Sequence, residues 1–300
     1  MHQTLERLRG TVGLWTHTLE SLMPAQLGDV TAGVEAAGFR ALWLPEAYGR
    51  EAMTGAQLLL ERSSDLVVAT GIASIYARDA MASASASRTL ASVSSGRFVL
   101  GLGVSHRPLV ERVRGGSYDA PLRAMASYLD ALDGAAVLSA EHDVVVPTVL
   151  AALGPRMLRL SAERTDGALT YLVTTEHTRR ARETLGADAF LAVEQSVVLG
   201  VDRDEFLRRA HEHLNIYTGL ENYRASWRRL GFGDEDFVRG GSERLCDALV
   251  LHGDTEAIGR GVDAHLDAGA DHVCLQVLGE TLVEVPVREW DDLGARLTPR

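Results

Sequence analysis

The sequence predicts an α/β protein that folds as one (β/α)8 barrel, a TIM barrel, over residues 1–300. Apolar runs of strand length alternate with helical patterns along almost the whole chain, which is typical of strand–helix repeats around a parallel sheet. The helix, glycine and strand of Val34–Leu44 also resemble those of His265–Leu275, although chance similarity between two common units would look the same. A repeated unit near both ends of the chain favours a closed barrel.

The first half of the chain contains four expected strands, at residues 11–17, 41–44, 66–74 and 98–104. The last of these shows no polar alternation, so it should be covered on both faces, as in a parallel sheet. Helices are expected from Pro24 to Gly38, over 54–64, and from Asp79 to about Ser94. Pro and Asp are favoured at helix starts and Gly just beyond a helix end, which defines these limits.

The second half supplies the other four strands, at residues 146–153, 168–173, 190–200 and 273–278. Helical patterns lie between them, at 121–138, from 155 to about 165, at 174–185 and at 256–268. Residues 202–253 break this rhythm, because they have helical periodicity but are several times longer than an ordinary connection. We expect a helical insertion after the seventh strand, within one domain.

The composition limits the classes of function. With 46% hydrophobic and 24% charged residues the chain is an ordinary soluble protein, and a net charge of −11 argues against nucleic-acid or basic membrane-surface binding. Residues 1–10 lack the apolar core of a secretory signal, and the longest apolar run, 144–153, is too short to span a bilayer. We therefore expect a cytoplasmic protein without nucleic-acid or membrane partners.

Several kinds of chemistry are disfavoured. All thirty basic residues are Arg, which excludes a Schiff-base lysine. Cys246 and Cys274 are too few for a disulfide framework and are expected to be packing residues. His211 and His213 stand two apart on an expected helix and would face different ways, so no metal site is expected.

Ionisable residues follow several of the expected strands, where a barrel places its active site. His106 is the main catalytic candidate, as a hydrogen-bond donor or as an acid near neutral pH, although it could be a solvated loop residue. Glu46 could be a second catalytic residue or only the ion-pair partner of Arg50. Glu194 lies within a strand, so it is a site acid or a hydrogen-bonded structural one.

Two glycine-containing segments suggest a bound phosphate. Gly154–Pro155–Arg156 opens a helix and could bind an anion, or it could be an ordinary capped turn. In this acidic protein an anion would need a local basic cluster, for which the candidates are Arg78, Arg107, Arg156 and Arg159. Gly101-x-Gly103 does not continue as a dinucleotide fingerprint, because His106 occupies its third glycine position.

Four motifs together resemble one known family. They are residues 68–79, 96–106, 153–157 with Asp166–Gly167, and 268–276, and they follow one another along almost the whole chain. These residues look like the luciferase-like monooxygenase superfamily, in its branch of oxidoreductases that use the deazaflavin coenzyme F-420. The first two motifs are specific, and the others are weak alone.

The resemblance implies where the cofactor binds. The third strand would bulge at a non-proline cis peptide bond between Gly71 and Ile72, and the bulge with Ala73 would support the deazaflavin ring. Ser105 and His106 would touch the ring, and backbone of Leu153, Gly154, Pro155 and Arg156 would hold the phosphate. Sugar-phosphate dehydrogenases of the family carry a His after strand two and a Glu after strand four, whereas Glu46 and His106 take these places here. The exchange puts that substrate and mechanism in doubt.

We therefore expect an oxidoreductase that transfers a hydride between F-420 and a small organic substrate. A monooxygenase that uses reduced FMN and oxygen is the alternative, because both cofactors would rest on the same bulge and both carry a phosphate. A binding protein without catalysis is less favoured, since ionisable residues follow three strands. The family commonly forms pairs, and the small-residue segment 79–94 suits close packing between subunits, so we expect a homodimer.

Overall fold

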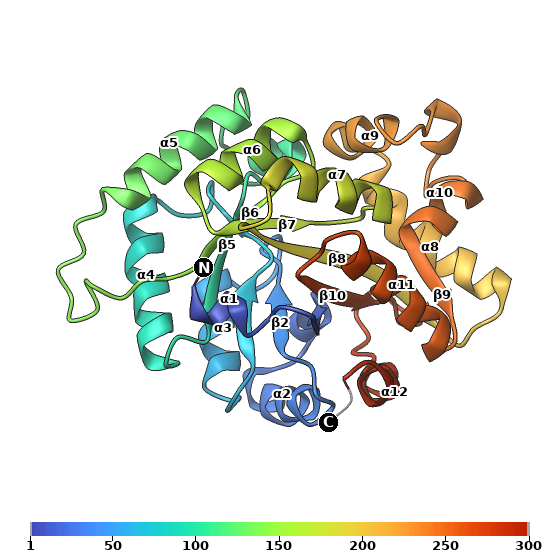
Figure 1. The fold of residues 1–300 in the computed structure, drawn as a ribbon, viewed down its shortest axis with the longest axis horizontal. Coiled ribbons are helices and arrows are strands. Elements are labelled where there is room, and N and C mark those ends of the chain that lie inside the picture. Colours follow the sequence, from blue (N-terminus) through green and yellow to red (C-terminus); the bar gives the residue numbers. More distant parts are fainter. Residues whose placement is uncertain (1, 299–300) are drawn as a thin grey trace.

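The computed structural model, which describes residues 2–298, confirms the (β/α)8 barrel. All neighbouring strands are parallel, and pairing of β8 with β10 closes the sheet (Figure 1). The barrel strands are β1 (Thr11–Trp15), β2 (Ala41–Leu44), β3 (Val67–Thr70), β5 (Phe98–Gly103), β6 (Thr148–Ala151), β7 (Gly167–Thr170), β8 (Phe190–Leu199) and β10 (His272–Val277). The short β4 (Ala73–Ser74) continues the line of β3 and pairs with β5.

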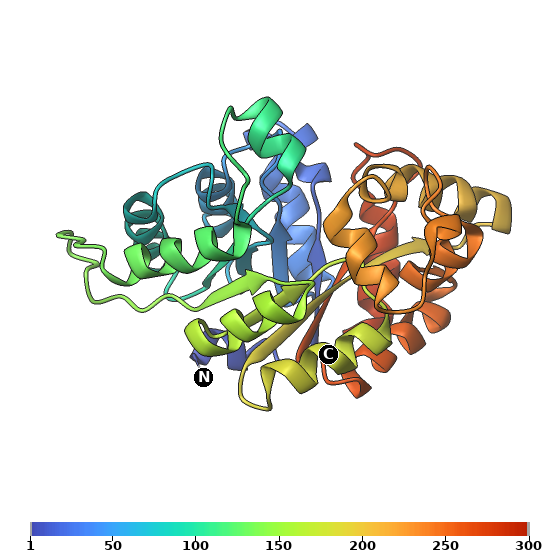
Figure 2. The same cartoon turned by 90° about the horizontal axis from the view of Figure 1, so that it is seen from above.

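The outer helices surround this sheet in Figures 1 and 2. They are α2 (Leu27–Ala36), α3 (Ala52–Leu60), α4 (Ala80–Val93), α5 (Pro121–Asp133), α6 (Pro155–Arg164), α7 (Thr175–Leu185), α11 (Thr255–Asp267) and α12 (Val287–Leu297). Asp79 caps α4 as predicted, accepting a hydrogen bond from Ala82 N at 2.8 Å.

Three helices differ by two residues or more from their expected bounds. Helix α5 ends at Asp133 instead of 138, because Gly134 follows as its C-terminal cap. Helix α3 begins at Ala52 instead of 54, because the Glu51 carboxylate accepts hydrogen bonds from the N–H groups of Met53 and Thr54. A short 3-10 turn, Pro24–Gln26, precedes α2 where a continuous helix was expected.

The segment 202–253 consists mainly of helices, as predicted: α8 (Arg203–Tyr217), α9 (Glu221–Arg228) and α10 (Glu243–Leu249). It ends in a strand that the sequence pattern did not reveal, β9 (Val250–Gly253), which pairs in parallel with β8. Figure 1 shows these elements together at one side of the barrel. The indole of Trp227 donates a hydrogen bond to Leu172 O at 3.1 Å, which fastens α9 to the chain just beyond β7.

Alternation along the strands divides the apolar side chains between two layers. On β8, Phe190 and Ala192 pack inside the barrel, whereas Leu191 and Val193 pack toward the outer helices. Helix α1 (Gln3–Glu6) and the turn after it contribute Leu5 and Leu8 to the interior cluster. Because both faces of the strands are buried, the strands read as continuous apolar runs in the sequence.

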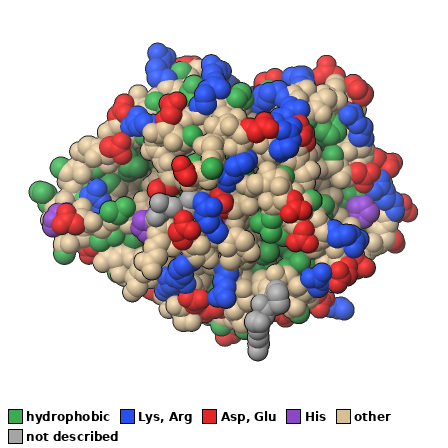
Figure 3. All heavy atoms as spheres, viewed as in Figure 1, with side chains coloured by type: hydrophobic (Ala, Val, Ile, Leu, Met, Phe, Trp, Pro, Cys, Tyr) green, Lys and Arg blue, Asp and Glu red, His purple; other side chains and the backbone are tan. Residues whose placement is uncertain are grey.

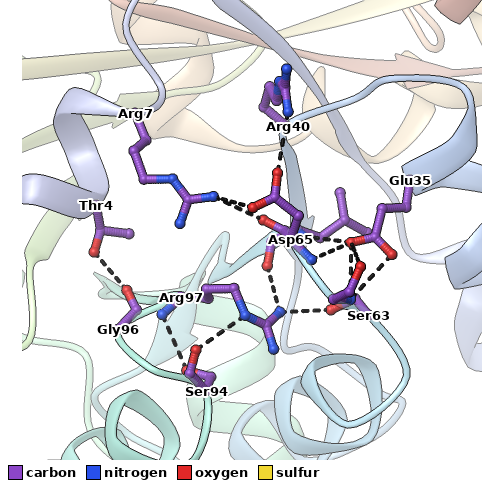
Figure 4. A network of polar contacts seen from close by, with 11 residues as sticks. Thr4, Arg7, Glu35, Arg40, Ser63, Asp65, Ser94, Gly96 and Arg97 are labelled. Carbon is purple, nitrogen blue, oxygen red and sulfur yellow. Dashed lines mark hydrogen bonds and ion pairs between the residues drawn. The ribbon is translucent and has the colours of Figure 1, made fainter.

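A polar network ties together the segments that precede the strands (Figure 4). Asp65 accepts from Arg7 Nη2 at 2.5 Å and from Arg40 Nη1 at 3.2 Å, and Arg97 donates to Ser63 Oγ and Leu66 O at 2.9 and 3.0 Å. The Thr4 hydroxyl donates to Gly96 O at 2.6 Å. In TIM barrels the face at the N-terminal ends of the strands serves stability, and the opposite face carries the chemistry. The active site is therefore expected at the C-terminal ends of the strands.

The surface agrees with the composition. On the face shown in Figure 3, acidic and basic side chains are interspersed over most elements. Within residues 2–298, no helix combines the length and apolar character that a membrane-spanning segment needs.

Candidate active site

The chain bulges between β3 and β4, and the Gly71–Ile72 peptide bond there is cis, as the family resemblance implies. The Trp15 indole Nε1 donates to Gly71 O at 2.7 Å, which joins the end of β1 to the bulge. A Cβ atom on Gly103 would collide with the Ile72 side chain, and one on Gly101 would collide with Thr70 O. The two glycines of β5 therefore allow the close approach of the bulge. Both lie within the strand, so they are not part of a dinucleotide-binding turn.

Glu46 is almost fully buried beside this bulge. Its carboxylate accepts from Ser74 N at 2.8 Å, from Ala52 N at 3.3 Å and from a guanidinium nitrogen of Arg78. The suggested partner Arg50 instead donates to the backbone oxygens of Leu19 and Leu22. Glu46 thus holds the segment after the bulge in place, and its proposed part in catalysis remains a prediction.

His106 lies three residues beyond the end of β5. Ser105, with a φ of 54°, turns the chain before it, and the Ser105 carbonyl accepts from the Tyr118 hydroxyl at 3.1 Å. His106 Nδ1 is buried and has no hydrogen-bond partner among the described residues. Burial lowers the pKa of His106 to about 4, so its imidazole is neutral at pH 7. It can donate or accept a hydrogen bond, and a pKa this low favours the hydrogen-bond donor over the acid near neutral pH, while its part in catalysis stays a prediction.

An aromatic cluster that the sequence analysis missed covers the same end of the barrel. Ring centroids lie 5.0 Å apart for Trp15 and Tyr171, 5.5 Å for Tyr171 and Tyr217, and 5.0 Å for Tyr217 and Tyr223. The ring of Tyr223 also lies 5.8 Å from that of His106. The insertion therefore supplies Tyr217 and Tyr223 to the site. In the sequence both belong to the segment with helical periodicity, where aromatic residues are expected to pack in a core. Only their hydroxyl groups indicated a polar role.

The start of α6 has the features of an anion site. Gly154 is its N-cap, with extended backbone and no side-chain cap, so the first N–H groups of the helix lack a side-chain partner from the cap. Arg229, from the end of α9, donates to Leu153 O at 3.1 Å and lies close to Gly154. The expected basic cluster is partly wrong, because Arg78 binds Glu46 and Arg107 binds Glu111. Arg229 was missed because it follows the site by some 75 residues in sequence.

Glu194 is fully buried inside the barrel. Its carboxylate accepts from Leu172 N at 2.9 Å and from the Ser196 hydroxyl at 2.8 Å. The Ser196 hydroxyl also contacts His213 Nε2, at 3.1 Å, on α8 of the insertion. Burial raises the pKa of Glu194 to about 7, since these hydrogen bonds offset only part of the lost solvation. The sequence left Glu194 as either a site acid or a hydrogen-bonded structural acid. The structure shows the hydrogen bonds, and a role in the site stays a prediction.

The histidines of the insertion and the two cysteines are also possible metal ligands by residue type. His211 contacts Gly240 O at 3.1 Å while His213 contacts Ser196, so the two rings face different ways as expected. Cys246 and Cys274 are buried and not paired with each other. In the part of the chain that the structure describes, no three His, Cys, Asp or Glu side chains are grouped to hold a metal ion.

Comparisons with known proteins agree with this architecture. Over 152 residues the chain is 27% identical to the 5,10-methylenetetrahydromethanopterin reductase of Methanolobus tindarius, covering 45% of this chain and 46% of that protein. Over 176 residues it is 28% identical to a Mycobacterium tuberculosis protein named as a candidate coenzyme F-420-dependent oxidoreductase, covering 49% and 51%. The chain thus spans about half the length of these curated relatives.

Two solved structures share the fold. An F-420-dependent secondary alcohol dehydrogenase with an F-420–acetone adduct superposes with a TM-score of 0.78 at 13% identity, over 97% of this chain and 99% of that one. The FMN complex of the 3,6-diketocamphane monooxygenase component of Pseudomonas putida gives 0.67 at 14% identity, over 96% and 98%. The model of the family described as luciferase-like monooxygenase matches residues 10–270. The chain therefore belongs to the luciferase-like monooxygenase family.

Proposed function

We propose that this protein is an oxidoreductase that transfers a hydride between coenzyme F-420 and a small organic substrate. One observation carries the proposal: His106 Nδ1, beyond the end of β5, is buried and has no hydrogen-bond partner among residues 2–298. It lies close in sequence to the strand on which the bulge rests. A buried polar atom without a partner is costly unless a ligand completes its hydrogen bonding. The curated relatives named for F-420 or for a methanopterin reductase support an oxidoreductase of this kind.

The residues at the barrel mouth fit such a cofactor. Ile72, held over Gly103, offers an apolar surface for one face of a planar ring, and Ser105 with His106 offers polar groups beside it. The uncapped N-terminus of α6 and Arg229 suit a phosphate. When bound, a deazaflavin would supply or accept the hydride at its C5 atom.

His106 would act on the substrate as a neutral imidazole. Hydride transfer to the carbon of a C=O or C=N group leaves negative charge on the heteroatom, and a hydrogen bond from the imidazole N–H stabilises that charge. A pKa of about 4 makes an imidazolium at pH 7 a rare species. We therefore assign His106 to hydrogen-bond donation, with the proton itself supplied from elsewhere.

A second function is an FMN-dependent monooxygenase. The same apolar surface at Ile72 and the same anion site would receive FMN, and the Pseudomonas putida fold relative has FMN bound. The aromatic cluster over the mouth favours neither cofactor, because both rings are planar and apolar on their faces.

Titration with each cofactor separates these functions. Purified protein is mixed with F-420 or FMN, and binding is followed by the fluorescence of the chromophore. We expect F-420 to bind at least about tenfold more tightly than FMN, which is about 1.4 kcal/mol. Tighter binding of FMN, with oxygen consumed when the flavin is reduced, would favour the monooxygenase. Binding of neither cofactor would contradict both proposals.

We further propose a homodimer in the cytoplasm. Two buried, unpaired cysteines suit a reducing compartment. Helix α4 buries its small residues Ser83, Ala84 and Ser87 within the subunit but exposes Met81 and Val93, so a pairing surface there would include these two apolar side chains. Light scattering at micromolar concentration tests the dimer, and a particle of about 32.4 kDa would contradict it.

A further inference from the structure

A line of hydrogen bonds runs from the buried Glu194 through Ser196 to His213, and its direction follows when Glu194 is ionised. The Ser196 hydroxyl then donates its one proton to Glu194 Oε1, so toward His213 it accepts. His213 Nε2 therefore carries a proton, and its Nδ1 is an acceptor. Every hydrogen bond in the line donates toward the carboxylate, which is the arrangement needed to deliver a proton from His213 to Glu194.

The outer end of the line borders a hollow at the surface. His213, which is itself buried, lines this hollow together with His17, Arg209, Glu212 and Leu278. His17 stands just beyond the end of β1, and its Nε2 contacts Leu282 O at 2.7 Å. Water in this hollow can approach the His213 ring, whereas Glu194 itself is completely buried.

The inner end of the line faces the aromatic cluster of the candidate active site. Glu194 and Ser196 stand two apart on β8, on the same side of the strand as the interior residue Ala192. Burial raises the pKa values of Tyr171, Tyr217 and Tyr223, and the charge of the nearby Glu194 adds to this effect. Tyr223 in turn packs against His106.

We propose that Ser196 and His213 conduct protons between solvent and Glu194, and that Glu194 holds the proton exchanged with the active site in each turnover. The second half of this proposal rests on the proposed oxidoreductase function, whereas the first half does not. Glu194 is accordingly a proton-holding residue that acts on the active site through the three tyrosines of the aromatic cluster.

The neighbours of both ionisable groups are compatible with this role. Glu194 faces Cys274 on β10, Tyr171 just beyond β7, Tyr217 on α8 and Tyr223 on α9, which are all neutral at pH 7. No Arg among residues 2–298 bonds to it. No neighbouring positive charge therefore stabilises the ionised carboxylate of Glu194 against its protonated form. Around His213 the hollow contains His17, Arg209 and Glu212. Burial and the charge of His17 lower the pKa of His213 to about 3, so its resting imidazole is neutral and would pass a proton by taking one up at one ring nitrogen and giving one up at the other.

The proton balances the reaction. In the reducing direction a hydride adds to the carbon of a C=O or C=N bond, the π electrons move to the heteroatom, and that heteroatom takes one proton. The hydride and its two electrons would come from the reduced deazaflavin, which would be oxidised and would release its own ring N–H proton to water. The proton comes from water in the hollow through His213 and Ser196, and Glu194 is reprotonated after it gives its own proton to the site. Oxidation of the substrate runs the same line outward.

The first test needs no cofactor. Infrared difference spectra of the free protein between pH 5.5 and 8.5 should show the C=O band of a buried protonated carboxyl that disappears on the alkaline side. Glu194→Gln should remove this band, while Asp236→Asn, which changes another buried carboxylate, should keep it. A spectrum in which Glu194→Gln changes nothing would overturn the proposal, whatever cofactor the enzyme uses.

The second test measures turnover with F-420, or with FMN if that cofactor binds instead. Ser196→Ala breaks the line and should lower kcat at least about tenfold, with KM changed less than about twofold and with a larger solvent deuterium isotope effect. His213→Ala should behave alike, and added imidazole should restore part of its rate. Ser226→Ala is the matched control and should keep the rate, because it removes a buried hydroxyl on α9 that has no hydrogen-bond partner in the described part of the chain.

The two proposals fail in different ways. If neither cofactor supports turnover but the carboxyl band behaves as expected, the proposed function is wrong and the proton line stands. If turnover proceeds and Ser196→Ala keeps the pH profile and isotope effect of the natural protein, the proton line is wrong and the oxidoreductase stands.

Discussion

The indole of Trp15 donates a hydrogen bond to the backbone oxygen of Gly71 at 2.7 Å, across 56 residues of sequence. This contact joins the end of the first strand to the bulge of the third. Both residues are buried, so the Gly71 oxygen has no access to water in place of the indole. The position of Ile72, and with it the proposed cofactor surface, therefore depends on a side chain from another strand.

Trp15→Phe should destabilise the fold. The Gly71 oxygen would lose its partner, which costs about 1–3 kcal/mol, in addition to the packing lost with the smaller ring. Trp43→Phe is the matched control, because Trp43 is buried to a similar degree but its Nε1 has no hydrogen-bond partner among the described residues. Urea unfolding should show the larger loss for Trp15→Phe, and equal losses would mean that the hydrogen bond contributes nothing.

Glu194 should make the stability of the protein depend on pH. Its pKa is about 7 in the folded protein against an ordinary value of 4.5, so the folded state binds more protons than the unfolded state between these values. Stability therefore falls as pH rises through this window. Glu194→Gln should remove the fall, because a Gln can accept from Leu172 N and donate to Ser196 Oγ.

The variant should match the natural protein near pH 4.5 and exceed its free energy of unfolding at pH 8 by on the order of 3 kcal/mol. Asp236→Asn should change the free energy of unfolding at pH 8 in the opposite direction. Burial acts to raise the pKa of Asp236, but hydrogen bonds from Ser242 and Gly233 and the charge of Arg244 hold it below its ordinary value. Its loss should destabilise the protein at pH 8. Thermal unfolding at several pH values measures both effects.

The sequence predicted the barrel because its signals are local. Strands buried on both faces read as apolar runs, and caps such as Asp79 define helix starts within a few residues. The site was harder to predict because it depends on contacts between distant residues. The partner of Glu46 is Arg78 rather than Arg50, since the chain after the bulge brings Arg78 to the carboxylate, and no periodicity reveals that.

The insertion shows the same limit. Its helices were predicted from periodicity, but the pairing of β9 with β8 requires the closed sheet as a context. Tyr217, Tyr223 and Arg229 lie in the expected insertion, and only the fold brings them to the barrel mouth. The pKa of His106 could not be read from the sequence either, because it follows from how deeply the ring is buried.

His106→Ala should lower kcat at least about tenfold and change cofactor affinity much less, because it removes a hydrogen bond to the charge that develops on the substrate. The contribution of His106 should not change between pH 6 and 8, since its pKa is about 4 and the imidazole stays neutral. His142→Ala, at an exposed loop histidine, is the control. Full activity of His106→Ala, or an inflection near pH 6.5 that His106→Ala abolishes, would contradict this assignment.

Arg229→Ala should weaken binding of a phosphate-bearing cofactor about tenfold, which corresponds to about 1.4 kcal/mol. The guanidinium of Arg229 lies beside Gly154, where the first N–H groups of α6 are available to bind an anion. Arg228→Ala is the closest control, because its neighbouring guanidinium is already paired with Glu221 and Asp234 at 3.0 and 2.8 Å. Fluorescence titration at 50 and 300 mM salt measures both variants. The deficit of Arg229→Ala should shrink at high salt, where charge interactions are screened, and an equal loss in both variants would place the phosphate elsewhere.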